Sequence, residues 1–142
     1  MPSQDEIDEK FKDHIRLRLG ADRFLTRAQE KALLLEAIDC DIALDEARRL
    51  IESVAGGRKA SLESEVDTVM HALMTTLVRD RGWISRTKFE TAAAACQRLS
   101  QGKIGDREAK ARVKRMMIEN GWQIRGAVVF GQPKWFRDIA EN

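Results

Sequence analysis

Basic side chains at helical spacing are the residues of this sequence best suited to chemistry. Residues 106–122 read DREAKARVKRMMIENGW, and a helix through them places Arg107, Lys110 and Lys114 on one side. The opposite side carries the small or apolar residues Ala109, Val113, Met116 and Met117. Exposed guanidinium and ammonium groups can neutralise phosphates and donate to guanine edges. The segment therefore indicates recognition of a polyanion, although the same face on an isolated helix is also typical of ordinary solvated surface.

The ends and flanks of this helix are also marked in the sequence. Asp106 is predicted to cap the N-terminus, and Gly121 is predicted to end the helix in a left-handed conformation. Oppositely charged residues four positions apart predict ion pairs along the flanks, namely Glu108 with Arg112 and Arg115 with Glu119. These pairs leave Arg107, Lys110 and Lys114 without acidic partners.

The positive charge of the chain is concentrated in its C-terminal part. The 142 residues have a formal net charge of +2. Residues 1–60 carry 11 basic and 13 acidic side chains, whereas residues 61–142 carry 14 basic and 10 acidic ones. All 14 of these basic residues fall within residues 79–137, against five acidic residues. This asymmetry predicts a polyanionic partner for the C-terminal part.

Few residues are suited to catalysis or to binding a metal. The chain has two histidines, two cysteines and no tyrosine, so we expect no enzyme, no cofactor and no metal site. Cys40 and Cys96 stand far apart beside small or apolar residues, which is typical of reduced, buried thiols. The acidic residues 39–46 resemble a calcium-binding EF-hand loop at first sight, but the central glycine and the final glutamate are missing. We expect those aspartates to form a turn and a helix cap.

The composition fits a soluble globular protein. Hydrophobic residues make up 43% of the chain and charged residues 34%, and the length allows one medium domain or two small ones. The N-terminus is polar and acidic without a signal-peptide pattern, and no apolar run approaches the roughly 20 residues of a membrane span. We therefore expect a cytoplasmic protein with no membrane partner.

Hydrophobic periodicity predicts a mainly helical chain. The predicted helices lie at about residues 4–19, 26–39, 45–54, 61–81, 85–99 and 106–120. Thr26, Ser61 and Ser85 are predicted N-caps, and Thr26 with Gln29 has the spacing of a capping box. Residues 56–60 form the expected boundary. Residues 1–57 would then be an N-terminal region with a helical hairpin for dimerisation or partner contact, and residues 61–142 a second domain.

Two segments of the C-terminal part favour strands instead of helices. Residues 83–84, Trp and Ile, predict a very short strand. Residues 122–137 are rich in aromatic and β-branched types and predict a β-hairpin, interrupted by Gly126, Gly131 and Pro133. The turn can lie anywhere between those interruptions, with Trp135 and Phe136 on the return strand. The predicted fold class is therefore mainly α with a small C-terminal β-hairpin.

The order of elements from residue 61 onward resembles the winged helix-turn-helix superfamily. A long helix, a short strand, two helices and a hairpin follow one another, with the signatures GWIS at residues 82–85 and ENGW at residues 119–122. The resemblance covers about residues 61–139. It implies a winged-helix-like domain that binds duplex DNA, with Arg107, Lys110 and Lys114 in or beside the major groove.

The resemblance implies further contacts outside that helix. Arg125 and Lys134 on the hairpin would touch phosphates or the minor groove, and backbone contacts that fix position would come from Arg86, Lys88 and Lys103. The connection at residues 100–105 is longer than a tight helix-turn-helix turn. Winged-helix domains also serve as scaffolds, so the alternative is a protein-interaction module whose basic surface meets an acidic partner. The tryptophans are expected to seal the core in preference to stacking on bases.

Overall fold

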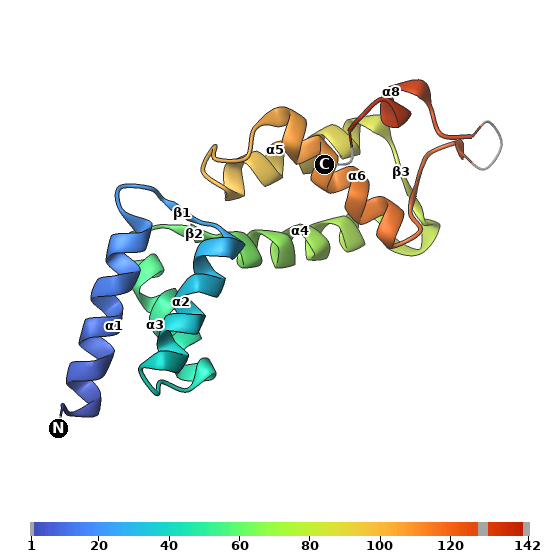
Figure 1. Ribbon diagram of the computed structural model, residues 1–142. Coiled ribbons are helices and arrows are strands. Elements are labelled where there is room, and N and C mark those ends of the chain that lie inside the picture. Colours follow the sequence, from blue (N-terminus) through green and yellow to red (C-terminus); the bar gives the residue numbers. More distant parts are fainter. Residues whose placement is uncertain (1, 128–130, 141–142) are drawn as a thin grey trace. The chain divides into compact units, whose positions relative to one another are not determined.

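The computed structural model describes residues 2–127 and 131–140, and its chain divides into two compact units. The first unit comprises Met1–Glu65 and the second Val66–Asn142. Helices dominate both units, as the sequence predicts, and the strands occur only as short pairs in the described residues. Figure 1 shows the order of the elements along the chain.

The first unit is a small helical bundle closed by a short strand pair. Its elements are α1 (Gln4–Leu19), β1 (Phe24–Leu25), α2 (Arg27–Asp39), α3 (Leu44–Gly57) and β2 (Ser61–Leu62). Helix α1 packs against α2 and α3, and the two strands pair in parallel with Phe24 beside Ser61. Thr26 caps α2 in the predicted capping box with Gln29. Ser61, a predicted helix cap, lies instead in β2, where it extends the strand pair.

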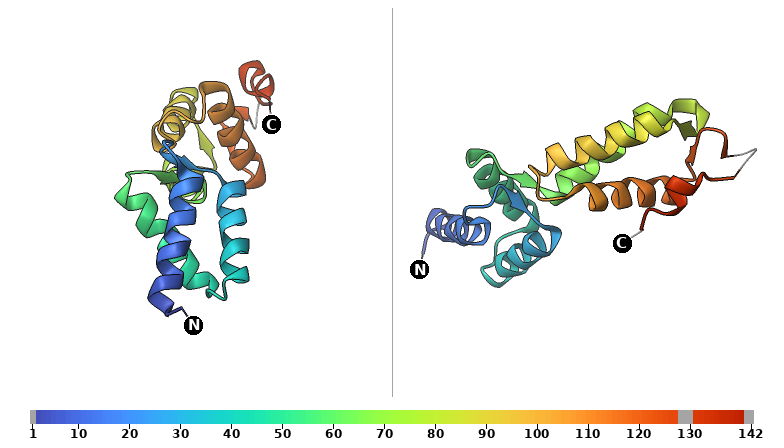
Figure 2. Two further views of the ribbon diagram at one scale, coloured as in Figure 1. Left: turned by 60° about the vertical axis from the view of Figure 1, so that its left-hand side comes forward. Right: turned by 90° about the horizontal axis from the view of Figure 1, so that it is seen from above.

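The second unit is built from a similar set of elements. It contains α4 (Glu63–Val78) except for its first residues, which belong to the first unit. After α4 come η1 (Arg79–Arg81), β3 (Trp83–Ile84), α5 (Arg86–Leu99), α6 (Asp106–Glu119), β4 (Gln123–Ile124) and α8 (Lys134–Arg137). Helices α5 and α6 lie side by side, as the views in Figure 2 show. Strands β3 and β4 pair in parallel, with Trp83 beside Gln123. Gly105, not Asp106, occupies the N-cap position of α6.

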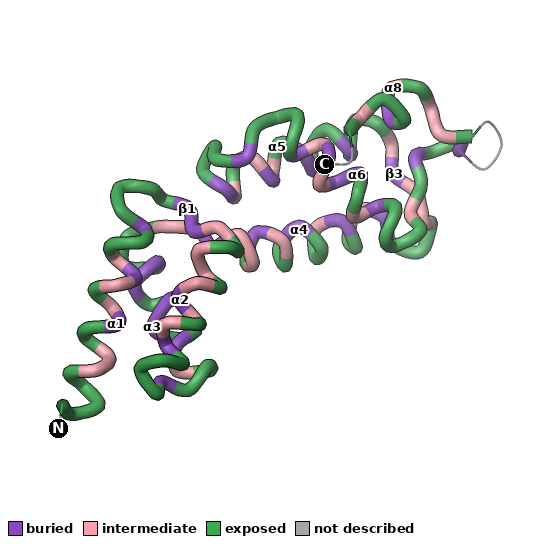
Figure 3. Tube along the Cα trace, in the orientation of Figure 1, coloured by how far each residue is buried: buried purple, intermediate pink, exposed green. Residues whose placement is uncertain are grey.

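The two units repeat one pattern of buried residues. Helices α1 and α4 are both 16 residues long, and their buried positions correspond at a spacing of 59 residues. Phe11, Ile15 and Leu19 in α1 match Met70, Met74 and Val78 in α4. In α3 and α6 the spacing is 62 residues, and the matching buried pairs are Ala47 with Ala109, Ile51 with Val113, and Ala55 with Met117. Figure 3 shows buried and exposed positions alternating along these helices.

The turns that connect the helices repeat as well. A residue with positive φ follows the first helix of each unit, Gly20 at 58° and Arg79 at 51°. At the end of the third helix, Lys59 and Gly121 take the same left-handed conformation, with φ of 55° and 70°. The next amides then donate back into the helix at 2.8 Å, Ala60 to the Ala55 carbonyl and Trp122 to the Met117 carbonyl. Each unit is therefore one copy of the pattern helix, strand, helix, helix, strand.

The predicted C-terminal hairpin is the main point on which the structure differs. Strand β4 pairs with β3 in parallel, and residues 134–137 form the short helix α8, so the return strand predicted through Trp135 and Phe136 is wrong. Phe136 is buried, and both rings pack edge-on against Phe89 of α5. Residues 128–130 of the predicted hairpin lie outside the described residues. Packing of the two rings on α5 outweighs the strand preference of their residue types.

Candidate functional site

The basic face predicted on α6 is only partly exposed. Lys114, predicted to project into solvent, is buried, with 6% of its surface accessible. Its ammonium group donates to the carbonyl oxygens of Arg137 at 3.1 Å and Ile139 at 2.7 Å, and lies 5.3 Å from the centre of the Phe136 ring. The expectation of an exposed Lys114 is therefore wrong. This lysine fixes the C-terminal segment to α6, because a buried ammonium group needs acceptors.

The two other cations of that face differ from each other. Lys110 pairs with Asp106 one turn earlier, at 3.2 Å, so the expectation that Lys110 is unpaired is also wrong. Arg107 is exposed, as predicted. The predicted flank pair of Glu108 with Arg112 is confirmed at 3.0 Å. Arg107 thus remains as the available cation of the three predicted for groove contact.

The predicted cations outside α6 lie in three places. Arg86 pairs with Glu90 at 3.2 Å, and its guanidinium lies 4.8 Å from the centre of the Trp135 ring. Lys134 is exposed in the first turn of α8. Lys103 is exposed in the connection between α5 and α6. These positions place Arg86 near α8 and leave Lys103 in the connection that leads into α6.

Arg125 and Lys88 belong to a cluster of cations around Trp83. The guanidinium groups of Arg81 and Arg125 each lie 5.2 Å from the centre of the Trp83 ring. Together with Lys88 they line a hollow of about 140 Å³ that also includes Ser85. All three cations are exposed, and within the described part of the chain none of them has an ion pair. We call Arg81, Lys88, Arg125 and Trp83 the Trp83 cluster.

Backbone geometry brings the Trp83 cluster together. Arg81 ends the 3-10 turn η1, and Gly82 then takes a left-handed φ of 74° that leads into β3. The parallel pairing of β3 with β4 places Arg125 beside the end of β3, where its amide donates to the Ile84 carbonyl at 2.8 Å. Lys88 lies in the first turn of α5, whose N-cap is Ser85; the Lys88 amide donates to the Ser85 hydroxyl oxygen at 3.2 Å. The cluster therefore surrounds the N-terminal end of a 14-residue helix.

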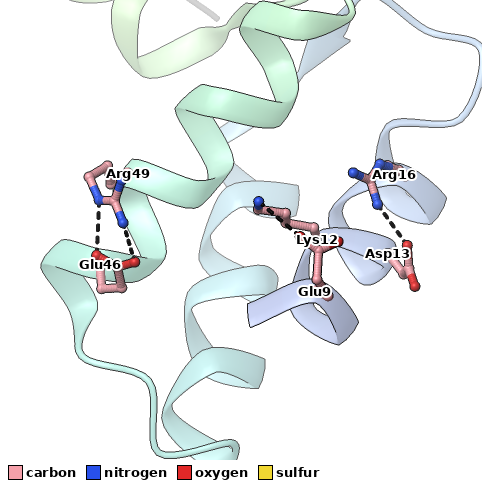
Figure 4. A network of polar contacts seen from close by, with 6 residues as sticks. All are labelled: Glu9, Lys12, Asp13, Arg16, Glu46 and Arg49. Carbon is pink, nitrogen blue, oxygen red and sulfur yellow. Dashed lines mark hydrogen bonds and ion pairs between the residues drawn. The ribbon is translucent and has the colours of Figure 1, made fainter. Parts of the chain in front are cut away.

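Cations of the first unit are used differently. Lys12 pairs with Glu9 at 3.2 Å, Arg16 pairs with Asp13 at 2.7 Å, and Arg49 pairs with Glu46, all within single helices (Figure 4). Pairs of this kind satisfy both charges locally. The first unit carries 11 basic and 15 acidic side chains, net −4, whereas the second carries 14 basic and 8 acidic ones, net +6. The net positive charge thus belongs to the second unit.

Neither cysteine forms part of a chemical site in the structure. Cys96 is buried as predicted, and burial raises the pKa of its thiol. Cys40, predicted to be buried, is exposed at the end of α2. Among the described residues, no three histidine, cysteine or acidic side chains are grouped so that they could hold a metal ion. His71 is exposed and stands 5.9 Å from the Trp122 ring, centre to centre.

Comparison with known proteins adds no family to these observations. No family model, curated protein or solved structure matches the chain. In the described part of the chain, every helix is too short or too polar to traverse a lipid bilayer.

Sequence reasoning missed Arg81 as a member of the cluster. Arg125 and Lys88 were predicted for different reasons, and residues 79–81 were predicted only as the end of a helix. The signal lay in the internal repeat, because the structure aligns Arg81 with Asp22 and Arg125 with Glu63. Reversal of charge at equivalent positions marks the places where the two units diverge.

Proposed function

We propose that the second unit binds duplex DNA through an exposed basic surface centred on the Trp83 cluster, and that the protein acts as a regulator or as part of a DNA-handling complex. The observation that carries this proposal is the convergence of three cations without ion pairs in a unit of net charge +6. Cations that lack protein partners release condensed counterions when they meet phosphates, and this release favours binding. A cytoplasmic, non-enzymatic role is part of the same proposal.

The winged-helix resemblance supports the proposal through element order alone. Helix, short strand, helix, helix and strand follow one another from α4 to β4. The hairpin wing is not part of this support, because β3 and β4 pair in parallel. In the proposed complex Arg107 contacts DNA at the start of α6, while Arg125 and Lys88 contact phosphates from the other end of the unit. Lys134 and Lys103 add exposed positive charge.

A salt-dependent titration tests the proposal. We expect the full chain to bind a fluorescently labelled duplex in an anisotropy assay, with affinity falling steeply between about 50 and 200 mM salt. The slope of log affinity against log salt should be roughly −0.9 for each phosphate neutralised. Absence of binding at the lower salt concentration would exclude the proposed function.

Two sets of charge reversals locate the surface. Changing Arg81 and Arg125 to glutamate should abolish binding at moderate salt, because it reverses two cations of the cluster. Changing Arg107 alone should weaken binding by less and lower the salt slope by about one phosphate. Changing Arg49 to glutamate in the first unit serves as the control and should leave binding nearly unaltered. A larger loss of DNA affinity on changing Arg107 than on changing Arg81 and Arg125 would show that the binding surface is centred on α6.

Exposed apolar residues of the first unit support a second role in protein interaction. Leu35 and Ile38 stand three positions apart on α2 and are 54% and 52% exposed, and Leu17 on α1 is 80% exposed. Exposed leucines and isoleucines near one another are typical of partner contacts. Homodimerisation through this unit predicts a mass that depends on concentration. Sedimentation without DNA measures this mass for the full chain and for a Leu35→Lys, Ile38→Lys variant.

A further inference from the structure

The starts of α2 and α5 are equivalent helix ends with opposite chemical surroundings. In the first unit the Thr26 amide donates to the Gln29 side-chain oxygen at 2.9 Å. The next amide, that of Arg27, donates to a carboxylate oxygen of Glu63 at 2.7 Å. Two side-chain oxygens, one of them charged, therefore satisfy amides at the N-terminal end of α2. The unpaired amides and the dipole of the helix favour a negative charge such as the Glu63 carboxylate at this end.

The second unit has cations where the first has these oxygen atoms. The strand register aligns Leu62 with Ile124, so that Arg125 stands where Glu63 stands. The spacing of 59 residues aligns Gln29 with Lys88, and both follow their N-cap by three positions. Neither arginine nor lysine has an acceptor to offer a backbone amide. The third replacement, Asp22 by Arg81, also changes the sign of the charge.

We propose that the hollow beside Trp83 is a phosphate-binding pocket, in which one phosphate takes the place that the Glu63 carboxylate fills in the first unit. The amides of Ser85 and Arg86, equivalent to those of Thr26 and Arg27, donate to phosphate oxygens. Arg81, Arg125 and Lys88 neutralise its charge from the walls of the hollow. The volume of about 140 Å³ suits a small anion.

Trp83 gives the pocket its preorganisation. Its half-buried ring lies 5.2 Å from each guanidinium carbon, which holds two long side chains beside the hollow before any anion arrives. Fixing the cations in advance lowers the entropy lost on binding. The tryptophan therefore acts as a positioning residue, and it need not stack on a base.

The phosphate is assigned to the backbone of a polynucleotide, and this assignment rests on the proposed function. A backbone phosphodiester held in a fixed pocket sets the position of the protein along the duplex without reading its sequence. The alternative source is a terminal phosphate monoester, which offers the same oxygen chemistry. Duplexes of one sequence with and without a 5′-phosphate distinguish the two sources. Equal affinity supports a backbone phosphate, and a requirement for the 5′-phosphate overturns the backbone assignment.

Titration with inorganic phosphate tests the pocket independently of DNA. We expect amide resonances of Arg86, Thr87 and Lys88 and the Trp83 indole resonance of the labelled full chain to shift on phosphate addition. Sodium chloride at matched ionic strength should not reproduce these shifts. Arg125→Glu introduces the residue type that the first unit carries at the equivalent position, Glu63. The new carboxylate would take the place of the phosphate, so this change should weaken phosphate binding at least roughly tenfold. Arg98→Glu makes the same charge change in the last turn of α5 and should leave the shifts intact.

Two further variants keep the test decisive. Lys88→Gln also copies the first unit and removes only one charge, so it reports on the pocket if Arg125→Glu does not fold. The reciprocal triple change of Asp22→Arg, Gln29→Lys and Glu63→Arg should create phosphate-dependent shifts at the start of α2. Phosphate shifts that persist in Arg125→Glu and in Lys88→Gln would overturn the pocket.

Failure of the pocket and failure of the proposed function are distinguishable. Phosphate shifts without duplex binding would leave the pocket standing and end the proposal of DNA binding. Duplex binding that is unaltered by Arg125→Glu and Lys88→Gln, together with an absence of phosphate shifts, would end the pocket and leave the proposal of DNA binding standing.

Discussion

The two units share a pattern of elements and differ in the charge on its surface. Both bury three matching positions in the first helix and three in the third, and both close with a parallel strand pair. The first unit satisfies a helix end with its own Glu63, whereas the second presents Arg125 there. The comparison teaches that buried apolar positions specify the pattern, while exposed positions around it are free to acquire opposite chemistry.

Truncation of equivalent core residues should destabilise the two units to a similar extent, and this is the largest effect that we predict. Ile15 and Met74 are both fully buried at matching positions of α1 and α4. Each change to alanine should lower the free energy of unfolding of its own unit by about 2–5 kcal/mol. All three tryptophans lie in the second unit, so their fluorescence follows that unit while circular dichroism follows both. An Ile15→Ala variant whose tryptophan transition shifts as far as that of Met74→Ala would show that the units unfold together.

Lys114 and Glu52 occupy matching positions of α6 and α3 but differ in burial. Lys114→Met should destabilise the second unit by about 1–3 kcal/mol, because it leaves two carbonyl oxygens of the C-terminal segment without their donor. Glu52→Met changes an exposed residue and should alter stability by no more than about 0.5 kcal/mol. Urea unfolding of both variants measures the difference. Equal effects would contradict a structural role for Lys114.

The helix caps offer a smaller, matched test. Thr26 and Ser85 cap α2 and α5 through the same bond to the third helical amide, at 3.2 Å in both cases. Each change to alanine should cost about 1 kcal/mol. Thr26→Ala should cost the more of the two, because it disrupts a reciprocal capping box that α5 lacks. Thermal unfolding gives the comparison, and a larger loss for Ser85→Ala would contradict it.

The smallest predicted effect concerns acid sensitivity of the first unit. The Arg18 guanidinium, which donates to Glu36 at 2.6 Å, lowers the pKa of that carboxyl, and His14 at 3.1 Å adds to the effect. A carboxyl whose pKa is lower in the folded state contributes stability above its unfolded pKa. That contribution is lost as pH falls through the folded pKa. We expect a loss of roughly 0.2–1 kcal/mol, because the pair is partly exposed.

Substitution of Glu36 by glutamine sharpens this last comparison. The matching position of the second unit is Ala95, which carries no charge. Glu36→Gln should therefore remove part of the acid dependence seen in circular dichroism and leave the tryptophan transition unaltered. An acid profile that does not respond to Glu36→Gln would show that other carboxyls dominate.

Most helices and their ends could be predicted from local sequence. Periodic apolar residues located α1, α2, α3, α5 and α6 to within a few residues, and Thr26 and Ser85 were correctly identified as caps. These features depend on residues close together in the chain, for which spacing is informative. Residues 83–84 were also correctly predicted as a strand.

The partners of the strands could not be predicted in the same way. Each strand is two residues long and pairs with a segment about 40 residues away, so no local period records the pairing. Trp135 and Phe136 carry strand-forming types, yet contact with Phe89 places them on a helix. The repeat itself was missed because few side chains are identical between the units.

The sequence by itself determined most of the helices, the caps of α2 and α5 and the excess of positive charge toward the C-terminus, because these follow from residue types at short spacing. Only the tertiary structure decided which cations are available. It buries Lys114 against carbonyl oxygens and brings Arg81 and Arg125 to one tryptophan from segments 44 residues apart. The physical reason is that burial and convergence depend on contacts between distant segments, which no local spacing encodes.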